Sequence, residues 1–145
     1  MGKNKLILAV SSSIEAFEEC SIEMKDNEEV VLAAVNYSGS SLQYASDRLR
    51  DDLKIVTAAD DEDIDALGYA SERLRNDKKL VLASVKMWGK TLEYASQELK
   101  NDKQVVLAAI KARASSIQYA SDNLKKDPLF IKAAKKVDSK IVDYL

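Results

Sequence analysis

The sequence predicts an all-α protein, a right-handed type of α-solenoid built from tandem helix-turn-helix repeats. The same residue pattern returns every 25 residues, and no gap is needed anywhere along the chain. A fixed period of this length is typical of stacked repeat architectures. The 145 residues also include only one proline and four glycines, fewer than the turns of an all-β protein usually need. We therefore expect short helices, repeated along the chain and packed against their neighbours.

The period divides the chain into six copies, which we expect to form a single repeat domain over residues 1–145. The first copy matches the pattern weakly and the last one is partial. Because one helical pair is too small to bury its own apolar face, neighbouring copies must bury it by stacking. The expected repeats are 1–25, 26–50, 51–75, 76–100, 101–125 and, in part, 126–145.

Each repeat is expected to begin with a helix that an Asp or Asn side chain caps. These side chains accept hydrogen bonds from the free N–H groups at a helix N-terminus. Pro128 follows Asp127 directly, at the first helical position, where a missing N–H has no cost. The body Val30–Val35 is apolar nearly all round, which predicts burial on most sides. The expected caps are Asn27, Asp52, Asp77, Asp102 and Asp127.

A second helix is expected in the later part of each repeat. Apolar or small residues from Leu42 to Leu49 follow the i, i+3, i+4, i+7 spacing of one helix face. Gly39 and Gly89 precede this stripe, where they would end the first helix. The serines of the stripe are interpreted as small packing residues whose hydroxyls bond back to the helix. They are Ser46, Ser71, Ser96 and Ser121.

The end copies carry lysines where the inner copies carry apolar residues. Lys5 takes the register position of Val30, and Lys132 and Lys135 take positions held elsewhere mainly by Leu or Val. Polar side chains at these places are typical of the capping repeats at the two ends of a stack. We expect the three lysines to be exposed.

The repeat consensus is roughly D-x-x-V-V-L-A-A-V followed by G-x-x-L-x-Y-A-S-x-x-L. It resembles the uncharacterised family called domain of unknown function 4116, over about residues 26–135. The core L-x-Y-A-S recurs at 42–46, 67–71 and 92–96, and with Ile at 117–121. The resemblance implies no catalytic residues. It implies interaction modules of bacterial and protist proteins, some of them secreted by host-associated bacteria.

Composition and charge disfavour several classes of partner. The formal net charge is -2, and no half of the chain has the clustered Lys and Arg that binding to nucleic-acid phosphates needs. No apolar run reaches the ~20 residues that span a bilayer. The apolar stretch Leu6–Val10 is shorter than the core of a secretion signal, which is ~7–15 residues long. We expect no membrane contact, and a cytoplasmic location is the default.

The sequence favours a protein without catalytic chemistry or cofactors. It has no histidine, the commonest general base. Cys20 stands at the register position of Ala45, and we interpret it as a small buried thiol, with a nucleophile as the alternative. Asp61, Asp63, Asp65 and Glu72 match a calcium-loop pattern at positions 1, 3, 5 and 12, but Ala66 replaces the necessary glycine. We therefore expect a solvated acidic turn and no metal.

This acidic turn is the first candidate binding surface, suited to a basic ligand or peptide. Asp60 occupies a register position held by Val35, Val85 and Ile110, so it must be partly exposed or have a partner. The five candidate residues are Asp60, Asp61, Glu62, Asp63 and Asp65.

A tyrosine that recurs once per repeat is the second candidate. If the second helix is regular, Tyr44 points away from the apolar stripe. The tyrosines would then form a row along the stack, either packing between adjacent second helices or binding a partner. Trp88, whose register is not aromatic elsewhere, is a further candidate anchor. The row consists of Tyr44, Tyr69, Tyr94, Tyr119 and Tyr144.

The leading hypothesis is therefore a non-catalytic helical-repeat module that binds a protein partner. A structural or spacer segment of a larger, secreted protein is the alternative. An enzyme that uses carboxylates alone is a weaker third hypothesis, because no pair of acids with a raised pKa can be argued from the sequence. Self-association through the tyrosines is a further option for the partner.

Overall fold

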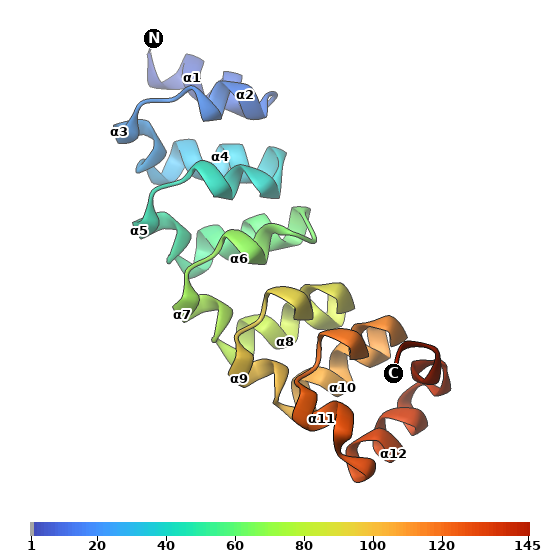
Figure 1. Cartoon of the computed structure of the whole chain (residues 1–145). Coiled ribbons are helices and arrows are strands. Elements are labelled where there is room, and N and C mark those ends of the chain that lie inside the picture. The colour runs from blue at the N-terminus through green and yellow to red at the C-terminus, as the bar shows by residue number, and fades with distance from the viewer. Residues whose placement is uncertain (1) are drawn as a thin grey trace. The chain divides into compact units, whose positions relative to one another are not determined.

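The computed structural model describes residues 2–145, and within this range every regular element is helical (Figure 1). Each full repeat consists of a ten-residue α-helix, a 3-10 segment and a short α-helix, in that order. The elements return with the 25-residue period that the sequence predicts. The predictions of an all-α class and of tandem repeats are confirmed.

The long helix of each repeat begins where the sequence places its cap. The side chain of Asp52 accepts a hydrogen bond from the N–H of Ile55 at 3.0 Å, and all five predicted Asp and Asn caps act in this way. Pro128 stands at the first helical position, as predicted. The long helices are α1 (Lys3–Val10), α4 (Glu28–Tyr37), α6 (Leu53–Glu62), α8 (Lys78–Met87), α10 (Lys103–Ala112) and α12 (Pro128–Val137).

The prediction of a regular second helix is wrong. A 3-10 segment ends at Tyr44, the backbone is extended at Ala45 and Ser46, and a short α-helix follows. Leu42 and Leu49 are nevertheless both fully buried. The apolar spacing therefore predicted correctly which residues are buried, but it did not indicate one continuous helix. The 3-10 segments are η1 (Gly39–Tyr44), η2 (Ala66–Tyr69), η3 (Gly89–Tyr94), η4 (Ala114–Tyr119) and η5 (Ser139–Tyr144). The short helices are α5 (Asp47–Arg50), α7 (Glu72–Arg75), α9 (Gln97–Lys100) and α11 (Asp122–Lys126), and the first repeat has α2 (Ile14–Glu18) and α3 (Ile22–Lys25) instead.

The repeated serines explain the break. Ser46 accepts a hydrogen bond from the N–H of Leu49 at 3.3 Å and so caps α5. Its hydroxyl donates to Asp26 of the preceding repeat at 2.5 Å, and its N–H donates to the carbonyl of Lys25 at 2.9 Å. An N-cap residue needs an extended backbone, so the interpretation of these serines as back-bonded packing residues is wrong. The same hydroxyl bonds join Ser71 to Asp51, Ser96 to Asn76 and Ser121 to Asn101.

Gly39 and Gly89 also act differently from the prediction. Neither has the positive φ of a C-terminal helix glycine, and no residue among 2–145 does. A side chain on Gly39 would instead meet the carbonyl of Ala59, and one on Gly89 would lie 2.6 Å from the carbonyl of Ala109. Each glycine therefore lets the next repeat approach closely.

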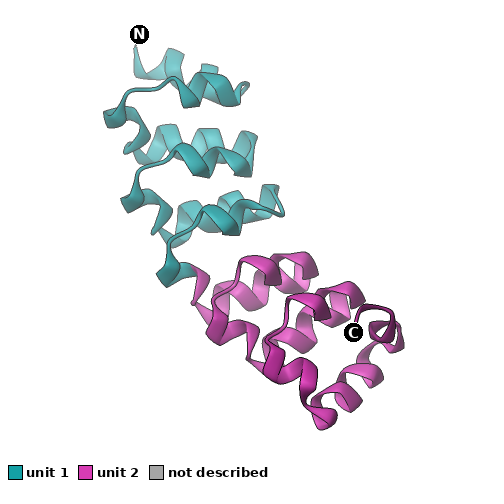
Figure 2. Cartoon of the chain, in the orientation of Figure 1, with its two compact units in different colours: residues 1–74 teal, residues 75–145 magenta. Residues whose placement is uncertain are grey.

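The chain divides into two compact units; the first ends at Leu74 and the second begins at Arg75 (Figure 2). In the first unit α1 packs on α4, α4 packs on α6, and η1 packs on η2. In the second unit α8 packs on α10, α10 packs on α12, and η4 packs on both η3 and η5. The core of each unit thus lies between successive long helices and the 3-10 segments beside them.

The lysines of the end copies lie where they were predicted. Lys5 on α1 is exposed, and so are Lys132 and Lys135 on α12. Among residues 2–145, no helix combines the length and the apolar character that a bilayer crossing requires.

Candidate functional site

The tyrosines share one structural position, the last residue of each 3-10 segment. In the first unit Tyr44 and Tyr69 end η1 and η2, which pack on each other. In the second unit Tyr94, Tyr119 and Tyr144 end η3, η4 and η5, which also pack in sequence. The first four side chains are half-buried and Tyr144 is 46% exposed. The tyrosines therefore form one row in each unit, partly packed and partly open to solvent.

The surroundings of Tyr44 show how such a rung is built. The ammonium nitrogen of Lys25 lies over its ring, 6.0 Å from the centroid, a separation suited to a cation–π contact. The same ammonium donates to the carbonyl of Glu18 at 2.6 Å. Burial raises the pKa of the Tyr44 phenol, and the hydrogen bond to Glu18 raises it further. The phenol stays protonated at neutral pH and acts as a donor.

Two basic residues that stand at the same position of successive repeats contact a tyrosine, because Lys25 lies over the ring of Tyr44 and Arg50 bonds to the backbone of Tyr69. Arg50 donates from Nε to the carbonyl of Tyr69 at 2.6 Å. In the second unit burial lowers the pKa of Lys100, Glu93 opposes this shift, and Arg75 adds to it. Nε of Arg75 is buried and has no hydrogen-bond partner within residues 2–145. A Lys or Arg stands at every twenty-fifth position from Lys25 to Lys125. This recurrence was visible in the sequence and could have indicated that the basic residues share one structural position.

The predicted acidic turn is only partly a surface. Asp60 is 4% exposed, so it belongs to the interior. The residue takes part in an interaction there. Asp61 and Glu62 are exposed on the last turn of α6, while Asp63 and Asp65 are half-buried. The side chain of Asp63 accepts from the N–H of Asp65 at 2.9 Å and so shapes the turn.

The same segment does not contain a calcium loop. The helix α6 continues to Glu62, and η2 begins at Ala66, so three residues separate two helical elements where such a loop needs twelve. The exposed acids Asp61 and Glu62 remain as a patch of negative charge.

Trp88 and Cys20 have separate environments. Trp88 is 40% exposed at the C-terminal end of α8, and its carbonyl accepts from both the N–H and the hydroxyl of Thr91 at 2.8 Å. Cys20 is half-buried, and its thiol donates to the carbonyl of Ala16 at 3.2 Å. Burial raises the pKa of this thiol, which disfavours the nucleophilic thiolate.

Comparison with known proteins gives one family. A search of curated proteins found no match, and a search of solved structures found none either. The family model described as "Domain of unknown function (DUF4116)" matches five overlapping segments, 3–50, 27–59, 61–100, 77–125 and 102–145. Three of these matches start at Asn27, Asp77 and Asp102, the caps of α4, α8 and α10. The match 77–125 spans two of the 25-residue repeats, and together the matches cover nearly the whole chain, which therefore belongs to the family of domain of unknown function DUF4116.

Proposed function

We propose that the chain is a non-catalytic α-solenoid module that binds a protein partner through its tyrosine rows. The observation that carries the proposal is the repeated half-burial of Tyr44, Tyr69, Tyr94 and Tyr119 at one structural position. A partner that contacts one rung of a row is in register to contact the next. Repeat proteins commonly bind through such extended surfaces.

Physical chemistry supports tyrosine in this role. A half-buried ring is already held by its neighbours, so it loses little side-chain freedom when a partner covers its exposed edge. Tyr44 also lies beside Lys25 and hydrogen-bonds to Glu18, which places apolar area and fixed charges within one contact. Aromatic residues with such neighbours are typical centres of binding energy.

Site-specific photocrosslinking tests the proposal without disturbing the fold. A photoreactive phenylalanine analogue replaces Tyr69 in one variant and Tyr119 in another, because an aromatic ring at these positions keeps the local packing. The matched control carries the analogue at Tyr37, which lies on α4, outside the row, and is 50% exposed. Each variant is mixed with lysate of the source organism or its host, irradiated and analysed by mass spectrometry.

The proposal expects the same crosslinked protein from positions 69 and 119 and none from position 37. Addition of unlabelled wild-type chain should compete for that crosslink. Equal capture from all three positions would indicate non-specific contact. No competed crosslink at positions 69 and 119, from variants whose circular dichroism matches wild type, would remove the tyrosine rows as the binding surface.

A structural or spacer role is the second candidate, and the same half-burial favours it. Tyrosines that pack between 3-10 segments and donate hydrogen bonds within the chain stabilise the stack without any partner. Under this hypothesis Tyr44→Ser lowers the free energy of unfolding substantially, and none of the three analogue variants gives a crosslink that unlabelled wild-type chain competes away.

A further inference from the structure

Within residues 2–145, the helix α12 has an exposed face whose counterparts on inner long helices are buried by the next repeat. Its counterparts on α10, Val106 and Ile110, are fully buried, because α12 packs on α10. In the first unit the same positions, Val31 and Val35 on α4, are fully buried where α6 packs on α4. The architecture therefore shapes this helix face to receive another helix.

On α12 these two register positions hold Ile131 and Lys135. Ile131 is half-buried and Lys135 is exposed. Val142, on the neighbouring η5, is 53% exposed, although its counterpart Ile117 is fully buried. The open face thus retains apolar groups that every covered copy buries, beside a lysine that no covered copy has.

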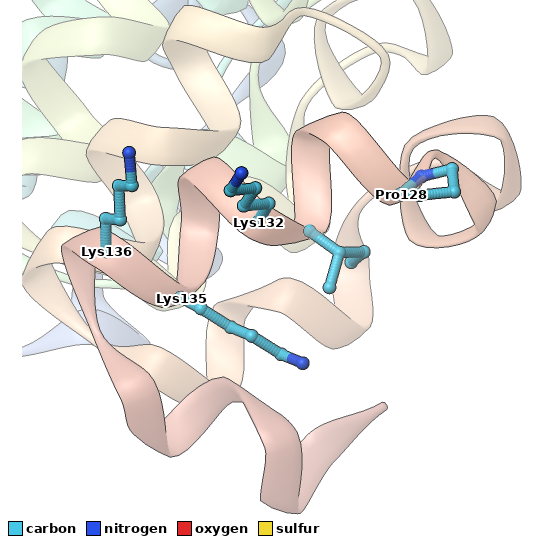
Figure 3. A pocket seen from close by; sticks show the side chains of 5 residues that line it. Pro128, Lys132, Lys135 and Lys136 are labelled. Atoms are coloured by element: carbon cyan, nitrogen blue, oxygen red, sulfur yellow. The ribbon is translucent and has the colours of Figure 1, made fainter.

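A groove of about 510 Å³ runs along this face. Pro128, Ile131, Lys132, Lys135 and Lys136 line it. Figure 3 shows Pro128 towards one end of the helix and Lys136 towards the other, with the ammonium groups of Lys132 and Lys136 on the same side. Within residues 2–145 none of the three lysines has an ion-pair partner. The groove combines an apolar floor with a rim of unpaired positive charge.

We infer that this groove binds an acidic amphipathic helix of a protein partner. Apolar residues of that helix would cover Ile131 and Val142, and its carboxylates would pair with Lys132, Lys135 and Lys136. Charge complementarity selects such a partner and rejects basic ones. No tyrosine of the rows lines the groove, so the inference does not depend on the proposed function.

Charge also argues against a second copy of the chain as the occupant. Head-to-tail stacking would place α1 of one copy on α12 of the other. The face that α1 would offer carries Lys5, at the register position where inner repeats have Val30 or Val105. That arrangement sets Lys5 against Lys135, and like charges in contact oppose association.

Two synthetic peptides with the sequences of the long helices of this chain provide matched probes. The peptide of residues 51–63 has six acidic residues and one lysine, whereas that of residues 101–113 has one acidic and three basic residues. Both have apolar residues at the register positions of Ile55, Val56 and Ala59. Both are held helical by the same staple on the solvent face, because short free peptides are poorly helical. Each is titrated into the ¹⁵N-labelled full chain and followed by NMR.

We expect the acidic peptide to shift the signals of α12 and η5 in a saturable manner, and the basic peptide to leave them unchanged. Lys132→Glu with Lys135→Glu should weaken binding at least tenfold, while Lys132→Arg with Lys135→Arg should retain it. All four substitutions are at exposed positions, so the fold should be kept.

Several results would overturn the inference. Equal binding of both peptides would mean that the charge does not select the partner, and shifts confined to other elements would place the site elsewhere. Sedimentation that shows a dimer with broadened α12 signals would assign the groove to a second copy. Co-sedimentation with phosphatidylserine vesicles, without any shift by the acidic peptide, would assign the lysines to a membrane surface.

Discussion

Replacement of Ser46 by alanine tests how adjacent repeats are held together. Its hydroxyl accepts from the N–H of Leu49 at 3.3 Å and donates to Asp26 at 2.5 Å. Loss of an N-cap costs about 1 kcal/mol, and loss of a hydrogen bond to a charged group costs about 1.5 kcal/mol at the lower end of its range. The lower end applies because Asp26 is half-buried and regains water. We expect the free energy of unfolding to fall by about 2 kcal/mol, since the two losses share one side chain.

Urea denaturation followed by circular dichroism measures this change. With a denaturant dependence of about 2 kcal/mol per molar urea, the midpoint should fall by about 1 M. Ser46→Thr retains the hydroxyl and should lose much less. Ser12→Ala is the control, because Ser12 is exposed and bonds only to carbonyls of its own helix. A loss for Ser46→Ala no larger than that of Ser12→Ala, with an unchanged denaturant dependence, would refute the role of the hydroxyl.

Three further predictions follow from packing and charge. Gly39→Ala should lower the free energy of unfolding by about 2 kcal/mol in a thermal or urea melt, because the added methyl meets a backbone carbonyl of the next repeat, whereas Gly2→Ala has open space around it and should be neutral. Hydrogen bonds from a serine and an arginine hold the pKa values of Asp26 and Asp51 below the ordinary value. These two carboxylates therefore stabilise the fold above pH ~4, and their contribution is lost as the pH falls through their folded pKa values. Asp26→Asn with Asp51→Asn should therefore flatten the decline of stability between about pH 5 and pH 3. Cys20, whose thiol pKa is raised by burial, should react with a thiol reagent at pH 8 more slowly than free cysteine, and equal rates would contradict the half-buried environment of the thiol.

The sequence by itself determined those features whose cause lies within a few residues. The side chain of an Asp or Asn cap accepts a hydrogen bond from an N–H two or three positions ahead. Asp52 and Asp127 therefore predict where their helices begin from the neighbouring residues alone. The proline after Asp127 fixes the same boundary. The 25-residue period, read across the chain, predicted the repeats and the exposed lysines at both ends.

Only the tertiary structure decided the second half of each repeat. The spacing from Leu42 to Leu49 fits a regular helix, but Ser46 bonds to Asp26, twenty residues away, and the backbone at Ser46 is extended. The register contained one signal for this contact. Arg48 bonds to Asp26 at 3.0 Å. In the next repeat the equivalent residues are again an arginine and an aspartate, Arg73 and Asp51, whereas the later repeats have neither.

The candidate sites divide in the same way. The tyrosine period was visible in the sequence, but the half-burial of Tyr69 depends on the packing of η2 against η1. Asp60 was a candidate binding residue because it belongs to a cluster of acids, whereas packing places it in the interior. The sequence predicted that Lys132 and Lys135 are exposed, but only the structure shows that they line one groove with Ile131. Capping is a contact along the chain, and burial is a contact across it, so the sequence predicts the first directly and the second only after the repeats are packed.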